Sequence, residues 1–126
     1  MHKGSVRITD LYEMFDYFNK EYFKSKLMTI TLLIQRSYAT EGKYTYTAEK
    51  RSKNCDGWLP RRDRLDHATI IISDYCYERD GEVEGTLLHE MCHQYQCEVL
   101  DRGASHDAIF CSMARRIERL TGYELL

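Results

Sequence analysis

The sequence has no long run of apolar residues, no Cys-x-x-Cys pair and no marked excess of charge of either sign. The first absence, together with a mean hydropathy of -0.57, excludes a membrane-spanning helix. No apolar stretch follows the N-terminal residues 1–5, so we expect no signal peptide. The 18 basic and 20 acidic residues give a net charge of -2, which by itself does not indicate a nucleic-acid-binding protein.

The cysteines and the length limit the class of protein further. The five cysteines are Cys55, Cys76, Cys92, Cys97 and Cys111. Their spacing excludes a zinc ribbon, and their odd number in a chain without a signal peptide argues against a disulfide scaffold. The 126 residues are 43% hydrophobic, which suits one folded domain. We therefore expect a single cytoplasmic, monomeric domain over residues 1–126, without a C-terminal zinc ribbon and without membrane contact.

Helical periodicity predicts three helices. In the first, Asp10 and Glu13 form a predicted capping box. Its apolar face consists of Leu11, Phe15, Phe18 and Tyr22. The second helix covers about 83–100. The third has Ser105 as its predicted N-cap and Gly122 as its predicted C-cap.

Three strands are predicted between the first and the second helix. β-Branched residues dominate 29–34 and 68–73, and tyrosine and alanine alternate with polar residues over 43–49. The segment 50–66 contains glycine, proline and many charges, which predict a loop or a long hairpin tip. Helices packed on a small sheet in this order define an α+β fold.

The sequence His89-Glu90-Met91-Cys92-His93 lies inside the second predicted helix. Because His89 and His93 are four residues apart, a helix places both imidazoles on one face, where they can bind a single Zn²⁺ ion. Glu90 lies about 100° around the helix from His89, beside the metal, where it would meet a metal-bound water. This is the arrangement found in zinc peptidases.

A catalytic zinc site needs a third protein ligand and leaves one position open. His106, near the start of the last predicted helix, is the best candidate. The long metzincin spacing fails, because Val99 occupies the position of its third histidine. Glu98, Glu118 and Glu124 are downstream alternatives. Glu98 is turned away from the histidine face, and an exposed ion pair is the simpler explanation for Glu118.

Structural interpretations compete with these assignments. A helical histidine pair can be purely structural, but Glu90 between the two histidines and His106 after them favour a metal site. Cys92 lies between the two histidines and Cys97 follows them, and we expect Cys92 to pack in the core rather than to bind metal. No aspartate is evident as a hydrogen-bond partner of the histidines, so we expect backbone carbonyls in that role.

The sequence resembles a known family, the SprT-like zinc metallopeptidases, which include the Spartan-type proteases. The resemblance covers Leu11 to about Gly122. It rests on the Leu11–Phe15–Asn19–Tyr22-Phe23–Leu27 pattern, the strand at 68–73, the residues from Thr86 to His93, and the segment from Ser105 to Phe110, which is similar to the His-x-x-x-Phe third-ligand segment of the family.

Carried over by position, the resemblance implies that His89, His93 and His106 bind Zn²⁺. Glu90 would be the catalytic acid/base of a metalloendopeptidase, which hydrolyses peptide bonds in protein substrates by attack of a zinc-bound water. Asp107 departs from the pattern, because a glycine often follows the third histidine. Two alternatives stay open: a metal-stabilised binding or regulatory module with little turnover, and a zinc hydrolase of non-peptide amides.

The segment from Lys50 to Arg64 has six basic and two acidic residues, a local charge of +4 in a chain of net charge -2. Its basic residues are Lys50, Arg51, Lys53, Arg61, Arg62 and Arg64. Trp58 lies among them and would stack on a base or pack as a loop anchor. The segment is either a solvated hairpin tip or a strip near the cleft that attracts an acidic protein or a substrate bound to nucleic acid.

The second interpretation predicts salt-sensitive binding of single-stranded DNA. Affinity should fall by roughly 0.9 log unit per log unit of salt for each phosphate that is neutralised. Binding is measured from low to physiological salt for the parent and for the double variant Arg61→Glu with Arg62→Glu. If the parent shows no salt-sensitive binding, or the double variant binds equally well, the segment is a solvated surface.

Overall fold

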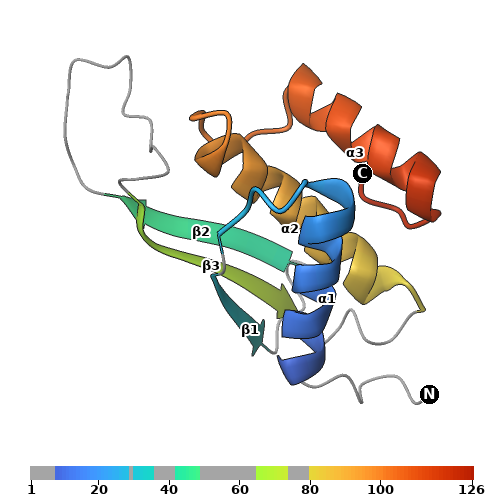
Figure 1. Cartoon of the computed structure of the whole chain (residues 1–126), viewed down its shortest axis with the longest axis horizontal. Coiled ribbons are helices and arrows are strands. Elements are labelled where there is room, and N and C mark those ends of the chain that lie inside the picture. Colours follow the sequence, from blue (N-terminus) through green and yellow to red (C-terminus); the bar gives the residue numbers. More distant parts are fainter. Residues whose placement is uncertain (1–7, 29, 36–41, 49–64, 74–79) are drawn as a thin grey trace.

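A computed structural model describes residues 8–28, 30–35, 42–48, 65–73 and 80–126. The elements are α1 (Ile8–Tyr22), β1 (Thr31–Gln35), β2 (Gly42–Ala48), β3 (Leu65–Ser73), α2 (Glu82–Glu98) and α3 (Ala108–Thr121). This is the predicted α+β fold, with helices packed on a small sheet (Figure 1). None of the helices in the described part of the chain combines the length and the apolar character needed to span a bilayer.

The sheet has the strand order β1-β3-β2. β1 pairs in parallel with β3, where Leu32 lies opposite Ile70, and β2 pairs antiparallel with β3. β3 is the central strand and pairs with a neighbouring strand along each edge. Its β-branched residues suit this buried position. Leu32, Ile70 and Ile72 are fully or almost fully buried. They form the part of the sheet that belongs to the hydrophobic core.

One strand is longer than predicted. β3 begins at Leu65 rather than at Ala68, so Leu65 and Asp66, which were expected to lie in a loop, belong to a strand. Pairing explains the difference, because Ala48 of β2 lies opposite Leu65 and extends the ladder past the β-branched run. The remainder of the predicted loop, from 50 to 64, lies outside the described residues.

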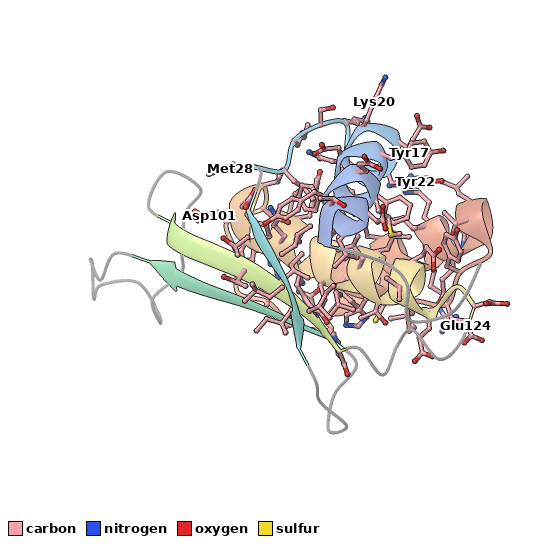
Figure 2. All side chains as sticks on the ribbon, turned by 90° about the horizontal axis from the view of Figure 1, so that it is seen from below. Tyr17, Lys20, Tyr22, Met28, Asp101 and Glu124 are labelled. Atoms are coloured by element: carbon pink, nitrogen blue, oxygen red, sulfur yellow. The ribbon has the colours of Figure 1, made fainter. Side chains whose placement is uncertain are left out.

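Helix α2 is the central helix of the structure. It packs on β2 and β3, while α3 packs against α2 and α1 contacts both β1 and α2 (Figure 1). Side chains fill the space between the sheet and the helices (Figure 2). Of the 17 residues of α2, 13 are buried, so almost every face of this helix meets protein. The core contacts of α2 come from Val83, Leu87, Leu88, Met91 and Cys92.

The helix ends correct two predictions. α1 begins at Ile8, so Asp10 lies within its first turn rather than at the N-cap position. α3 is capped by Asp107 rather than by Ser105, because the Asp107 carboxylate accepts the backbone N–H of Phe110 at 2.9 Å, three residues on. Gly122 is the C-cap, as predicted, with a φ of 84° that favours glycine.

The turn after α1 is held by the side chain of Asn19. Lys24 and Ser25 both adopt left-handed backbone conformations, with φ of 55° and 58°, which are costly for residues other than glycine. The Asn19 amide group compensates by donating to the carbonyl of Leu27 at 2.9 Å and accepting the N–H of Leu27 at 3.1 Å. These bonds fix the path by which the chain leaves α1, with Phe23 and Leu27 buried.

Replacing Asn19 by Ala should lower the free energy of unfolding by about 1–3 kcal/mol, because both backbone groups of Leu27 lose their partner. Chemical denaturation under fixed metal conditions measures this change. Lys20→Ala, at an exposed neighbouring position, is the control and should change stability by less than about 0.5 kcal/mol. Equal stability of the two variants would show that the turn does not depend on Asn19.

Candidate metal centre

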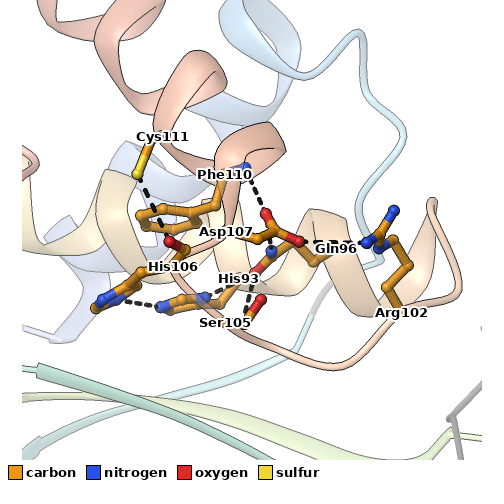
Figure 3. Close-up of polar contacts among 8 residues, drawn as sticks. All are labelled: His93, Gln96, Arg102, Ser105, His106, Asp107, Phe110 and Cys111. Carbon is orange, nitrogen blue, oxygen red and sulfur yellow. Dashed lines mark hydrogen bonds and ion pairs between the residues drawn. The ribbon is translucent and has the colours of Figure 1, made fainter.

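Three histidines converge on one point. His89 and His93 lie one turn apart on α2, and His106 precedes α3. One ring nitrogen from each lies within 4.8 Å of those of the other two. The Nε2 atoms of His93 and His106 are 3.2 Å apart and point toward each other (Figure 3). Ligand nitrogens of a tetrahedral zinc ion lie about 3.4 Å apart, given zinc–nitrogen bonds of about 2.0–2.1 Å, so this triad fits a common ion.

Phe110 forms an apolar support for all three rings. Its ring stacks on His93 with centroids 4.4 Å apart and lies 5.0 Å and 4.8 Å from the rings of His89 and His106. Phe110 itself is fully buried. In the sequence it is only the fourth residue after His106 in the third-ligand segment. The structure adds its physical role, which is to restrict the orientation of the three imidazoles.

A backbone carbonyl orients His89, as expected. Nδ1 of His89 lies 2.6 Å from the carbonyl oxygen of Leu125. Because a carbonyl can only accept, Nδ1 carries the hydrogen and donates it, which leaves the lone pair of Nε2 for a metal. The position of Leu125, 36 residues away in the chain, has no signature in the sequence.

The expectation of a backbone carbonyl is wrong for His93, whose partner is a side chain. Nδ1 of His93 lies 2.8 Å from Oε1 of Gln96 on the next turn of α2. The same oxygen accepts the backbone N–H of Ser105 at 3.1 Å, and Nε2 of Gln96 donates to Asp107 at 3.3 Å. Gln96 thus connects one histidine to the loop that carries His106 (Figure 3). The three-residue spacing from His93 was the only signal for it in the sequence.

Asp107, the residue that departs from the family pattern, anchors this loop. It caps α3 through the N–H of Phe110 and lies 3.4 Å from Arg102 in an ion pair (Figure 3). The backbone hydrogen bond from Phe110 is the largest cause of the lowered pKa of Asp107, and Arg102 lowers it further. The carboxylate is therefore charged at neutral pH, and it fixes the chain directly after His106.

The glutamates separate into different roles. Glu90 is buried next to His89 on α2, and both residues border a cavity of about 650 Å³. Glu98 accepts the N–H of Met28 at 2.8 Å and also bonds with Gln94. Glu118 lies 3.8 Å from Arg115, which is the expected ion pair. Among the described residues, the histidine cluster includes none of these carboxylates.

The described cysteines do not take part in the cluster. Cys92 is fully buried in the core, as expected, and burial raises the pKa of its thiol to about 12. Such a thiol stays protonated at neutral pH and is a poor metal ligand. Cys92, Cys97 and Cys111 form no disulfide.

A comparison with protein-family models gives a match over most of the chain. The model of the SprT-like family matches residues 11–125. The chain belongs to the SprT-like family. The SprT-like match begins at Leu11, in α1, and ends at Leu125. It therefore includes Leu125 and Gln96, the hydrogen-bond partners of His89 and His93. A comparison with curated proteins gives no match.

Burial lowers the pKa of His93, and the charges of His89 and His106 lower it further, although the hydrogen bond with Gln96 opposes them. In metal-free protein, the His93 ring should therefore titrate below the ordinary histidine pKa of about 6.5. The unfolded chain then binds a proton that the folded chain does not, so stability decreases as the pH falls below about 6.5. Nitrogen-15 NMR of the rings measures the titration, and a midpoint above 6.5 would contradict this assignment.

Proposed function

We propose that the chain is a zinc metalloendopeptidase that hydrolyses peptide bonds in protein substrates. The observation that carries this proposal is the convergence of His89, His93 and His106 on one point, with the buried Glu90 beside them at a cavity. The SprT-like family supports the same assignment.

The donor set favours zinc over other metals. Three imidazole nitrogens without a carboxylate suit Zn²⁺, whereas calcium and magnesium prefer oxygen ligands. A Zn²⁺ ion bound by three protein ligands would act as a Lewis acid with one open coordination position, and it would lower the pKa of a water at that position to about 7. His106 is exposed, while His93 is buried, so His106 is the more solvent-accessible of these two histidines.

Each polar group of the site has a definite task in hydrolysis. Leu125 and Gln96 hold the Nδ1 hydrogens of His89 and His93, which leaves both Nε2 lone pairs for the zinc ion that the triad would hold. Glu90 accepts a proton from the attacking water as the water oxygen bonds to the scissile carbonyl carbon. It then passes that proton to the leaving amine nitrogen as the carbon–nitrogen bond breaks.

The cavity and the completeness of the site suggest how substrates bind. The cavity extends from His89 and Glu90 along the first turns of α2 to residues 122–126, and its volume of about 650 Å³ suits several residues of a peptide. All proposed ligands come from one chain, so the proposed site would be complete in the monomer that we expect. The odd number of cysteines in the sequence fits a reducing compartment, and we propose a cytoplasmic location. The basic segment 50–64 lies outside the described residues, so its nucleic-acid contact stays a prediction.

Glu90→Gln should retain zinc but lose cleavage of an unfolded protein such as casein by at least about 100-fold, because the amide cannot accept the proton. His106→Ala should lose both zinc and activity, and removal of zinc from the parent should lower its melting temperature. Metal content, cleavage assays and thermal unfolding test these expectations.

Two outcomes would favour the alternatives. Zinc binding by a parent protein that cleaves neither casein nor small amides would indicate a binding or regulatory module. Cleavage of small amides without cleavage of casein would indicate a non-peptide hydrolase. Full activity of Glu90→Gln would remove Glu90 from the reaction.

A further inference from the structure

We propose that the C-terminal segment, residues 122–126, is a structural part of the metal centre and that Gly85 and Glu118 are the positioning residues that hold it against His89. The inference rests on the proposed metal site. Its starting point is the 2.6 Å contact between the Leu125 carbonyl oxygen and Nδ1 of His89. The direction of that carbonyl decides how the His89 ring is turned.

Glu118 fixes the direction of the carbonyl. Its Oε2 accepts the N–H of Leu125 at 2.8 Å and the N–H of Leu126 at 3.0 Å. The Leu126 N–H and the Leu125 carbonyl belong to one planar trans peptide unit, in which they point in opposite directions. When Glu118 holds this N–H, the carbonyl must point away from Glu118, and His89 lies there. The two backbone hydrogen bonds also lower the pKa of Glu118, so the carboxylate is charged at neutral pH.

Gly85 permits the segment to come close enough. A Cβ atom added to Gly85 would overlap the carbonyl oxygen of Glu124 and lie 3.4 Å from its carbonyl carbon. These are backbone atoms, which cannot move aside as a flexible side chain can. Gly85 lies four residues before His89 on the same face of α2, so the segment reaches His89 directly across this glycine.

Other contacts keep the segment in one place. Gly122, with φ 84°, turns the chain back from the end of α3 toward α2 (Figure 1). The Leu125 side chain is buried in the core, and the Tyr123 ring packs near Phe18 with centroids 6.5 Å apart. Glu124 lies beside the first part of α2 (Figure 2). The segment therefore also forms one wall of the cavity next to His89 and Glu90.

The test is the metal affinity of intact variants, measured by competition of Zn²⁺ with a chromophoric chelator. Gly85→Ala and Glu118→Ala should each weaken zinc binding by about 10–100-fold, the usual effect of losing a partner of a metal-bound histidine. Glu118→Gln should lose less, because its amide oxygen still accepts both N–H groups. Gly103→Ala is the matched control, since a Cβ there meets no atom within 4 Å, and it should bind as the parent does.

Cobalt separates positioning from ligation. At saturating Co²⁺, Gly85→Ala and Glu118→Ala should keep the parent absorption spectrum, because the ligands are unchanged. A changed spectrum for Glu118→Ala, with parent-like binding by Gly85→Ala, would identify Glu118 as a ligand and overturn the inference. Parent-like affinity of both variants would also overturn it, while the metal site would stand. A parent that binds neither metal would instead refute the proposed function.

Folding is checked by circular dichroism. If Gly85→Ala does not fold, the Glu118 variants decide the question, because Glu118 lies outside α2 and Glu118→Gln preserves its shape. A graded loss of affinity from parent to Gln to Ala supports positioning. Equal affinity of all three forms contradicts it.

Discussion

The burial of α2 on almost every side is the constraint on which the rest of the structure depends. A buried polar group needs a hydrogen-bond partner, and α2 carries several such groups into the interior. Gln94 donates to the carbonyl of Met28, Gln96 accepts the N–H of Ser105, and His89 bonds with Leu125. Each bond fixes a different segment of the chain against the same helix. The polar residues that carry the chemistry thus also organise the loops around them.

The surroundings of the histidines oppose two motions that would separate the three rings: charge repulsion and free rotation. Charge repulsion would drive protonated rings apart, but burial favours the neutral form of His93. Free rotation would turn the rings away from a common point, but Phe110 contacts all three of them. Hydrogen bonds at Nδ1 then leave Nε2 of His89 and of His93 as the nitrogen that would bind an ion. Such preorganisation reduces the entropy that must be lost when a metal binds.

The sequence predicted those parts of the site that depend on the spacing of residues within one helix. The four-residue repeat of His89 and His93 is a property of one helix, and the structure places His106 beside them. The capping box at Asp10 and the cap at Ser105 were wrong, because several polar residues near a helix end can serve as caps and the tertiary path selects among them. Gly85 contacts the backbone of Glu124, and the carbonyl of Leu125 contacts His89. Both contacts join segments that are far apart in the sequence, and no residue type predicts them.

The hydrogen-bond partners of His93 and His89 differ in how they tolerate substitution. Gln96 holds His93 with its side chain, so a substitution by a residue without a side-chain acceptor removes the bond. Leu125 holds His89 with a main-chain atom that every amino acid possesses. Substitution of Leu125 by another apolar residue that fills the same core space should therefore keep the bond. Loss of that bond is instead expected from substitutions at Gly85 and Glu118, which position the Leu125 backbone without contacting the imidazole.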